Sequence, residues 1–273
     1  MIELNKIDQQ FLFELVLKKS GIVLDKSKWY LIHDRLSSLL EEYQLCSLPE
    51  LIQFIKETQD LRIQAQLISA LTTNETLFFR DLKPFELLKN KLIPELIEKN
   101  QETKTIQIWS AACSTGQEAY SIAMTIRENF PQLNHWNIPI LATDICQKVL
   151  TRGVAGVYTQ AEINRGLPVK MLVKYFTNNQ DKWEIKEELK RMVTFKFMNF
   201  VEAWPAIPRM DIIFLRNVLI YFNPAMKKEV LSKMRKQLNK NGSLILGASE
   251  SIIGLEVPLC SKIYDDIRYF AGK

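Results

Sequence analysis

The sequence predicts an α/β protein with an N-terminal all-α domain, then a doubly wound, Rossmann-like sheet with a small antiparallel β-subdomain inserted. Three observations favour this fold class. Apolar residues recur at helical spacing as far as residue 71, and strand and helix patterns alternate from Thr105 onward. The strand patterns are nearly continuous apolar runs, as expected of strands covered on both faces.

The N-terminal domain, predicted over residues 1–75, consists of helical patterns separated by short breaks at Gly21 and around Pro49. These patterns read FLFELVLKK, WYLIHDRLSSLL, LPELIQFIKE and IQAQLISAL. Because their apolar residues repeat at helical spacing, we expect them to form one compact helical unit.

The segment TTNETLFFRD, residues 72–81, places small polar side chains directly before Phe78, Phe79 and Arg80. Taken alone, it is typical of a helix start, in which a residue among 72–74 caps the helix and the two phenylalanines fill a core. The role of Arg80 depends on the rest of the chain.

The second predicted domain covers residues 76–273. We expect its strands at residues 106–111, 138–145, 211–216 and 242–248, with helices at 116–129, from about 147, and at 224–240. The segment 157–198 fits this alternation badly. Its strand-like pieces WEIKEE and MVTFKF follow the turn-rich TNNQDK, which predicts a small antiparallel β-subdomain there.

Composition limits the classes of function. The 273 residues are 47% hydrophobic and carry a formal net charge of +5, which is weak support for nucleic-acid binding. No run approaches the roughly 18 to 20 apolar residues of a membrane span, and the N-terminus lacks a secretory signal, so we expect a cytoplasmic protein without membrane insertion. Four scattered cysteines and two histidines disfavour disulfides, a zinc site and a histidine-based triad, and no metal is predicted.

The turn after the first strand predicts a small-molecule site, because doubly wound sheets bind ligands where that strand meets its helix. The stretch IWSAACSTGQEAYSIAM is rich in small side chains and contains one glycine, Gly116, where the backbone can approach a ligand. A single glycine does not make the pyrophosphate cradle of dinucleotide sites, so a nucleoside without phosphates fits better. Glu118 either pairs with a cation or stabilises the helix N-terminus.

Asp144, at the end of LATDI, has two interpretations. It can accept hydrogen bonds from both hydroxyls of a ribose, or it can cap the next helix. The order of strand, small-residue turn, helix, strand and acid favours S-adenosylmethionine as the ligand, with S-adenosylhomocysteine as the product.

The motifs TTNETLFFRD, WSAACSTGQEAYSIAM, LATDI, RGVAGVY, MNFVEAWP and DIIFLRNVLIYF closely resemble those of the CheR-type chemotaxis receptor glutamate methyltransferases, in the same order. The resemblance extends from about Phe11 to Glu250. It implies a bacterial signal-transduction enzyme that methylates receptor glutamates with S-adenosylmethionine. It also implies a helical domain, a methyltransferase domain and an inserted β-subdomain, in agreement with the patterns above.

The resemblance also implies a set of site residues. Arg80 and Tyr221 are expected nearest the transferred methyl group, as the catalytic residues. Gly116 belongs to the expected cofactor-binding turn. The remaining expected cofactor-binding residues are Asn74, Thr76, Arg80, Glu118, Asp144, Asn199, Phe200, Arg216 and Asn217.

A glutamate side chain, with a pKa of about 4.3, is already an anionic nucleophile at neutral pH, so the implied reaction needs no general base. The enzyme has to hold a carboxylate oxygen roughly 3 to 3.5 Å from the methyl carbon, in line with the sulfur. We hypothesise that Arg80 holds one carboxylate oxygen and that Tyr221 hydrogen-bonds near the sulfur or the acceptor.

The resemblance implies docking on the cytoplasmic helical region of receptors through a basic early helix. Lys26, Lys28 and Arg35 match the start of that basic face, but the following turns read SSLLEEY, where relatives are rich in arginine. Relatives that bind a C-terminal receptor pentapeptide have a glycine-containing insertion in the β-subdomain. The segment FTNNQDKWEIKEELK has no glycine, so we expect no such tether. We also expect the protein to be a monomer.

Two other functions stay open from the sequence. The same chemistry could act on another protein carboxylate or on a small acid, which the altered docking helix permits. Alternatively, the chain could be a non-catalytic S-adenosylmethionine-binding scaffold or sensor, or, less plausibly, a nucleic-acid binder that uses its basic C-terminal half.

Overall fold

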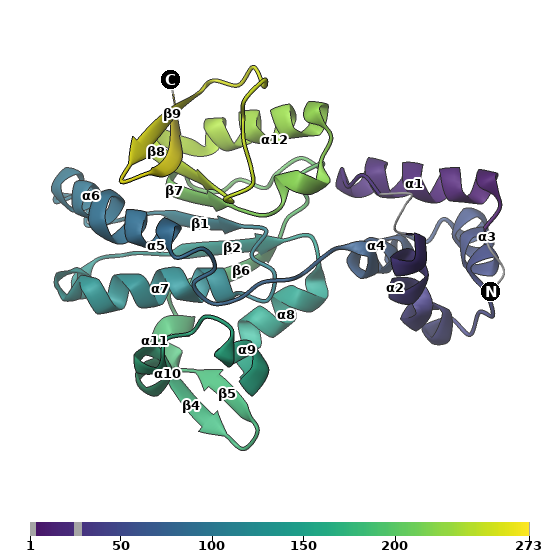
Figure 1. Cartoon of the computed structure of the whole chain (residues 1–273), viewed down its shortest axis with the longest axis horizontal. Helices are drawn as coiled ribbons and strands as arrows, with labels where there is room; N and C mark the ends of the chain where they lie inside the picture. The colour runs from purple at the N-terminus through teal and green to yellow at the C-terminus, as the bar shows by residue number, and fades with distance from the viewer. Residues whose placement is uncertain (1–3, 25–28, 273) are drawn as a thin grey trace.

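The computed structural model describes residues 4–24 and 29–272. A helical domain lies to one side of an α/β domain and is joined to it by the segment that leads into α5 (Figure 1). The helices of this N-terminal domain are α1 (Lys6–Ser20), α2 (Trp29–Glu42), α3 (Leu48–Thr58) and α4 (Leu61–Leu71).

Capping side chains define the starts of three of these helices. The side chains of Asn5, Ser47 and Asp60 accept hydrogen bonds from first-turn backbone N–H groups, and Gly21 ends α1 in the left-handed conformation at φ 74°. The apolar faces meet in a core of their own, as predicted. Its fully buried members include Leu12, Val16, Leu36, Leu51 and Ile63.

The main sheet has the strand order β6-β2-β1-β7-β8-β10-β9, and its first five strands are parallel. The predicted doubly wound α/β fold is therefore confirmed. The chain runs outward from β1 to β2 and β6, then returns to β7 on the other side of β1. The strands are β1 (Ile108–Ala111), β2 (Ile140–Asp144), β6 (Val193–Phe197), β7 (Met210–Leu215), β8 (Leu238–Leu246), β9 (Leu259–Tyr264) and β10 (Ile267–Gly272).

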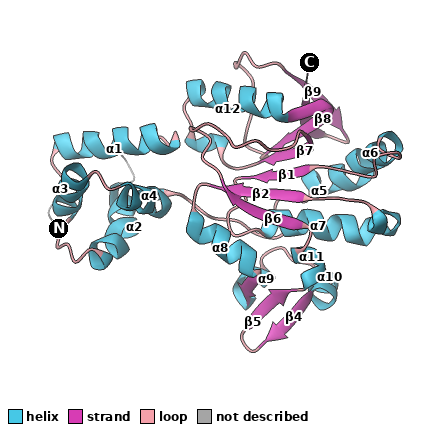
Figure 2. Cartoon of the chain, turned by 180° about the vertical axis from the view of Figure 1, so that it is seen from behind, coloured by secondary structure: helices cyan, strands magenta, loops and turns pink. Residues whose placement is uncertain are grey.

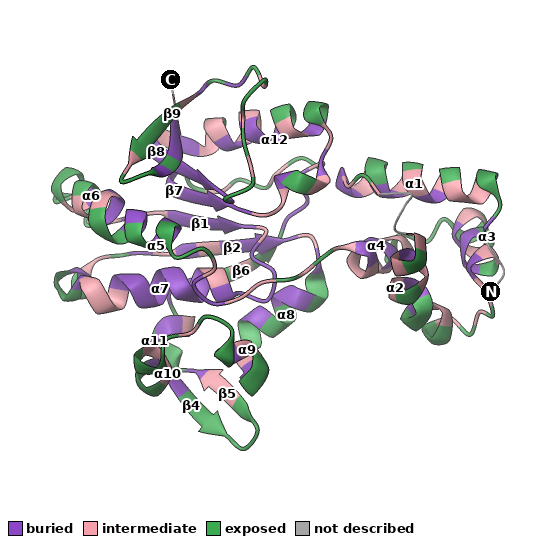
Figure 3. Ribbon diagram, in the orientation of Figure 1, coloured by how far each residue is buried: buried purple, intermediate pink, exposed green. Residues whose placement is uncertain are grey.

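Alternate residues of the central strands face two separate cores. Ile108 of β1 packs with the helices of one face, and Trp109 packs with the helix and loops of the other. All residues of β1 and β7 are buried, which explains their continuous apolar runs (Figure 3). The helices around the sheet are α5 (Lys83–Leu87), the π-helical turn η2 (Leu88–Leu92), α6 (Ile93–Lys99), α7 (Gln117–Asn129), η3 (Pro131–His135), α8 (Gln147–Ala155), η4 (Leu219–Tyr221) and α12 (Pro224–Gln237).

The small antiparallel sheet has the order β3-β5-β4 and projects below the main sheet in Figure 1. One strand expected there lies elsewhere: the MVTFKF segment forms β6, which pairs in parallel with β2 at the edge of the main sheet. Its Phe195 ring packs on Tyr120 of α7 and lies beside Gly153 of α8. The small sheet and its helices comprise β3 (Val157–Thr159), α9 (Gln160–Asn164), α10 (Val169–Tyr175), β4 (Phe176–Asn179), β5 (Lys182–Ile185) and α11 (Glu187–Lys190).

The C-terminal hairpin of β9 and β10 was not predicted. Its two-residue turn, Asp265 and Asp266, has positive φ at both positions, which is the geometry of a type I′ turn. The rear view shows this hairpin extending the sheet beyond β8 (Figure 2). None of the helices in residues 4–24 and 29–272 is long and apolar enough to cross a membrane.

Phe78 links the segment 72–82 to the small β-subdomain. Its ring is fully buried and meets Tyr158 and Phe176 edge-on, with centroid distances of 5.0 and 5.7 Å. Burial of Phe78 and Phe79 confirms that these residues fill a core, although residues 78–81 form turns rather than a helix and α5 begins only at Lys83.

We predict that Phe78→Ala lowers the free energy of unfolding by about 3 to 5 kcal/mol, because it leaves a cavity beside the rings of Tyr158 and Phe176. Leu82→Ala, at a side chain that is 60% exposed, is the matched control and should stay within about 0.5 kcal/mol. Urea unfolding measures both. A loss below about 1 kcal/mol for Phe78→Ala would contradict this packing.

Candidate active site

A cavity of about 920 Å³, including the part open to solvent, lies at the carboxyl ends of β1, β2, β6 and β7. This is where the strand order reverses between β1 and β7, the position at which doubly wound sheets bind ligands. Ten predicted site residues line it: Asn74, Thr76, Arg80, Glu118, Asp144, Asn199, Phe200, Arg216, Asn217 and Tyr221.

Gly116 is the exception, because it is not among the residues that line the cavity. It has φ 92° at the start of α7, and a Cβ there would come within 2.8 Å of the Phe195 ring. Gly116 is therefore needed for a left-handed backbone and for close packing against β6. Ala112, Cys113 and Ser114 line this part of the cavity instead.

Asp144 stands at the end of β2 with its carboxylate held from both sides. The N–H of Ser114 donates to Oδ2 and the N–H of Cys146 donates to Oδ1, each at 2.9 Å. Burial raises the pKa of Asp144, and these two hydrogen bonds oppose the shift. Since each carboxylate oxygen has a second lone pair, Asp144 can also accept from two hydroxyls of a ligand.

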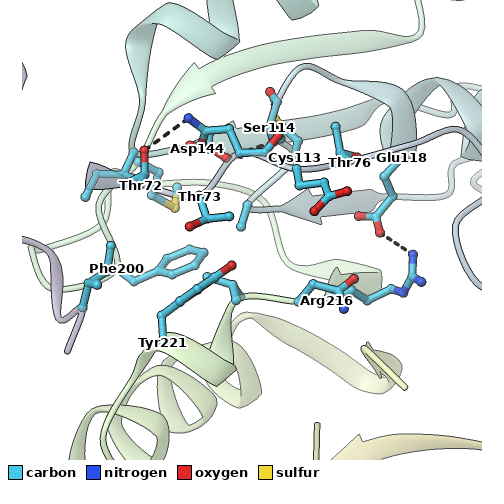
Figure 4. A pocket seen from close by; sticks show the side chains of 18 of the residues that line it. Thr72, Thr73, Thr76, Cys113, Ser114, Glu118, Asp144, Phe200, Arg216 and Tyr221 are labelled. Atoms are coloured by element: carbon cyan, nitrogen blue, oxygen red, sulfur yellow. Dashed lines mark hydrogen bonds and ion pairs between the residues drawn. The ribbon is translucent and has the colours of Figure 1, made fainter. Parts of the chain in front are cut away.

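Arg216, directly after β7, joins three parts of the cavity wall. Its buried guanidinium donates to Glu118 Oε2 at 2.8 Å, to Asp81 Oδ2 at 2.9 Å and to the backbone carbonyl of Arg80 at 2.8 Å (Figure 4 shows the bond to Glu118). Ser110 donates to the other oxygen of Glu118. Two carboxylates surround one guanidinium, so this wall has an excess of negative charge.

The segment 72–82 crosses the cavity and is fixed at several points. Ser114 Oγ donates to the carbonyl of Asn74 at 2.7 Å, and the N–H of Phe79 donates to Ser121 Oγ at 3.0 Å. Together with the bond from Arg216 to the Arg80 carbonyl, these contacts hold the segment against β1, α7 and β7.

Several residues at this cavity have a left-handed backbone that side chains other than glycine rarely adopt. Phe79, Asp81, Ala112, Ser114 and Asn217 all have φ between 50° and 64°. Such conformations cost free energy and persist only where surrounding contacts determine them, which is typical of functional sites.

Arg80 and Tyr221 approach the same cavity from the segment 72–82 and from η4. Within the described residues, the guanidinium of Arg80 has one hydrogen bond, to the carbonyl of Glu75 at 3.2 Å, which leaves donors available to a substrate. Tyr221 and Phe200 lie on the side of the cavity opposite Asp144 (Figure 4).

Both polar atoms of the Asn199 side chain form hydrogen bonds within the protein. Its Nδ2 donates to the carbonyl of Lys19 at 2.7 Å, and its Oδ1 accepts from the N–H of Val201 at 3.2 Å. It therefore fixes the end of α1 against the loop after β6, and Ser20 and Ile22 become part of the cavity wall. The sequence provided no signal for this contribution of α1.

The expected docking residues divide into two groups. Lys26 and Lys28 lie outside the described residues. Arg35 donates to the carbonyl of Leu71 at 2.8 Å and to Thr73 Oγ1 at 2.9 Å, so it anchors the start of the segment 72–82. The described part of the chain contains no group of three His, Cys, Asp or Glu residues that could hold a metal ion.

Sequence comparison identifies relatives over most of the chain. The family described as "CheR methyltransferase, SAM binding domain" matches residues 74–260, and "CheR methyltransferase, all-alpha domain" matches residues 7–72. The chemotaxis protein methyltransferase Cher2 of Pseudomonas putida is 41% identical over 89% of this chain and 90% of its own length. Chemotaxis protein methyltransferase 1 of Vibrio cholerae is 44% identical over 86% of each chain.

A solved structure with bound SAM, the magnesium protoporphyrin IX methyltransferase of Synechocystis, covers 82% of this chain and 96% of its own, at 9% identity and a TM-score of 0.36. That likeness is too weak to support a conclusion. The sequence relatives and both domain matches, in the order found here, are decisive: the chain belongs to the CheR methyltransferase family.

Proposed function

We propose that this S-adenosylmethionine-dependent methyltransferase transfers the methyl group to side-chain carboxylates of glutamates in chemotaxis receptors, giving glutamyl methyl esters. One observation supports this most strongly. A single cavity at the switch point of the sheet brings together a buried aspartate suited to a ribose, an acidic wall suited to a cation and an arginine with available donors.

The residues of the cavity fit the cofactor. Asp144 has lone pairs left for the two ribose hydroxyls, and the excess negative charge around Arg216 suits a ligand with a positively charged sulfur and amino group. In the proposal, Asn74, Thr76 and Glu118 hold the amino acid part, Asn199 and Phe200 flank the adenine, and Arg216 with Asn217 closes the far wall.

When bound, S-adenosylmethionine supplies a methyl group on a positively charged sulfur, which is already a reactive electrophile. The protein's task is to deliver the acceptor. Arg80 holds one oxygen of the glutamate carboxylate so that the other faces the methyl carbon, and the Tyr221 hydroxyl hydrogen-bonds near the sulfur or the acceptor. The carboxylate oxygen forms the new bond to carbon, the carbon–sulfur bond breaks with its electron pair left on sulfur, and no proton is moved.

The partner in this proposal is the cytoplasmic helical region of a receptor, which also places the reaction in the cytoplasm. We propose a monomer that works without a C-terminal pentapeptide tether. The two-residue turn between β4 and β5, Gln180 and Asp181, supports the latter because it has neither a glycine nor an insertion. Saturable, tight binding of a receptor C-terminal pentapeptide in calorimetry would contradict it.

One observation favours a second candidate, in which the acceptor is another protein carboxylate or a small acid. Arg35 uses its guanidinium to hold Leu71 and Thr73, and so offers less to an external partner than a free basic face would. Incubation with labelled S-adenosylmethionine and receptor-containing membranes separates the two. Alkali-labile label on the receptors supports the first proposal, and label confined to other acids supports the second.

Arg80→Lys is predicted to lower kcat about 10-fold or more, because a single ammonium replaces the planar fork that orients a carboxylate. Receptor methylation at saturating S-adenosylmethionine measures this. Arg268→Lys, at an exposed position on β10, is the matched control and should retain normal turnover. Normal turnover in Arg80→Lys would mean that Arg80 has only a structural role.

Asp144→Asn is predicted to weaken S-adenosylhomocysteine binding by about 10- to 100-fold, since hydrogen bonds to a charged acceptor contribute about 1.5 to 3 kcal/mol each. Titration calorimetry measures it, with Asp181→Asn in the exposed turn of the small sheet as the control.

The wild-type affinity should also depend on pH. Burial raises the pKa of Asp144, so its carboxylate becomes protonated at a higher pH than a solvated aspartate as the pH falls, and an acceptor for the ribose is lost. Affinity should therefore decline earlier on acidification than an ordinary aspartate would allow, and Asp144→Asn should lack that decline. An equal decline in the variant would assign it to another group.

A further inference from the structure

Glu250 lies in the loop after β8, and its carboxylate accepts four backbone hydrogen bonds. The N–H groups of Asn217 and Gly247 donate to Oε2 at 2.9 and 2.7 Å. Those of Val218 and Leu219 donate to Oε1 at 2.9 and 2.7 Å. The carboxylate thus connects the ends of the neighbouring parallel strands β7 and β8.

Three of the four donors are successive residues because of the local backbone conformation. Asn217 is left-handed at φ 59°, and the chain then enters η4, so three consecutive N–H groups point toward one place. Such a concave set of amides binds an anion, and here the anion is a side chain of the same protein. Without it, the N–H groups at the start of η4 would lack partners.

Gly247 shows how closely the two strand ends approach. A Cβ at this position would lie 2.8 Å from Glu250 Oε2 and 2.9 Å from Asn217 Nδ2. The carboxylate could avoid that contact only by giving up hydrogen bonds, so the glycine and the glutamate depend on each other.

The turn held by Glu250 forms one wall of the cavity. Asn217, Val218 and Tyr221 all line it, and the N–H of Tyr221 donates to the carbonyl of Val218 at 3.1 Å. The carbonyl of Tyr221 accepts from the N–H of Val23, beyond the end of α1, at 2.9 Å. A shift of the Asn217–Leu219 turn would therefore displace Tyr221.

We propose that Glu250 is a positioning residue for methyl transfer, which fixes the turn that presents Asn217 and Tyr221 to the reacting groups. This inference rests on the proposed function, because that function places Tyr221 near the transferred methyl group and Asn217 in the wall of the cofactor site. Glu250 itself is not among the residues that line the cavity, so its effect passes through the turn.

The test compares Glu250→Gln with Glu256→Gln. The amide retains one acceptor oxygen and turns an NH₂ group toward backbone donors, whereas the Glu256 side chain in the same loop is 91% exposed and contacts Lys228. In Glu250→Gln, kcat for receptor methylation should fall on the order of 10- to 100-fold, as expected for a misplacement near the reacting atoms. The KM for S-adenosylmethionine and the stoichiometry of S-adenosylhomocysteine binding should stay near the wild-type values. Glu256→Gln should match the wild type throughout.

Amide hydrogen exchange gives a readout that does not need turnover. Peptides that contain residues 217–219 should exchange faster in Glu250→Gln, while peptides around Asp144 should exchange as in the wild type. Gly247→Ala, which pushes on the same carboxylate from the other strand, should reproduce both the fall in kcat and the faster exchange. It also serves as the second variant if Glu250→Gln does not fold.

Unchanged kcat in both variants would overturn the proposal. So would a fall in kcat that is matched by an equal loss of binding stoichiometry and of thermal stability, because that pattern describes a residue needed only for folding. If the wild type binds S-adenosylhomocysteine but methylates no receptor, the proposed function fails. In that case amide exchange decides separately on Glu250. Unaltered exchange at residues 217–219 in Glu250→Gln would overturn its role, and faster exchange would support the inference that it fixes the turn.

Discussion

The arrangement of the site depends on the guanidinium of Arg216. It is almost completely buried, and a buried charge is tolerated only where it is paired and hydrogen-bonded. Its partners come from two other segments: Glu118 from the first turn of α7, and Asp81 with the Arg80 carbonyl from the segment 72–82. The bonds made by its two terminal nitrogens therefore bring together α7, the end of β7 and the segment that carries Arg80.

Glu250 has a corresponding role, with the charges reversed, for the adjoining part of the cavity wall formed by residues 217–221. There the carboxylate accepts hydrogen bonds from backbone N–H groups that directly follow β7 and β8. These bonds fix the start of the η4 turn, which carries Tyr221. The left-handed residues at the cavity lie beside these two charged centres and the Asp144 carboxylate, which supply the contacts that such conformations need. A reaction without a titrating base suits this design, because its requirement is fixed geometry rather than proton transfer.

The sequence predicted those parts of the fold and site that local patterns determine. Continuous apolar runs identified the buried strands β1, β2, β7 and β8, and their order located Glu118 and Asp144 at the cavity. The strand β6 was misplaced because its pattern does not reveal its partner, which is β2 in the main sheet. Glu250 was not predicted because three of its four partners are 31 to 33 residues away in the chain. Asn199 was predicted as a site residue, but its bond to Lys19, 180 residues away, was not. Gly116 was predicted in the cofactor-binding turn from its lack of a side chain. Its close packing on Phe195 could not be predicted, because Phe195 is distant in the chain.

A double-mutant cycle on Glu118→Gln and Asp81→Asn tests most directly whether Arg216 couples the cofactor wall to the segment that carries Arg80. Both carboxylates bind the same guanidinium, so the loss of one changes the contribution of the other to kcat/KM. We expect their effects on kcat/KM to be non-additive by about 1 kcal/mol or more. Additivity to within about 0.3 to 0.5 kcal/mol would show that the two walls act independently and would contradict the account.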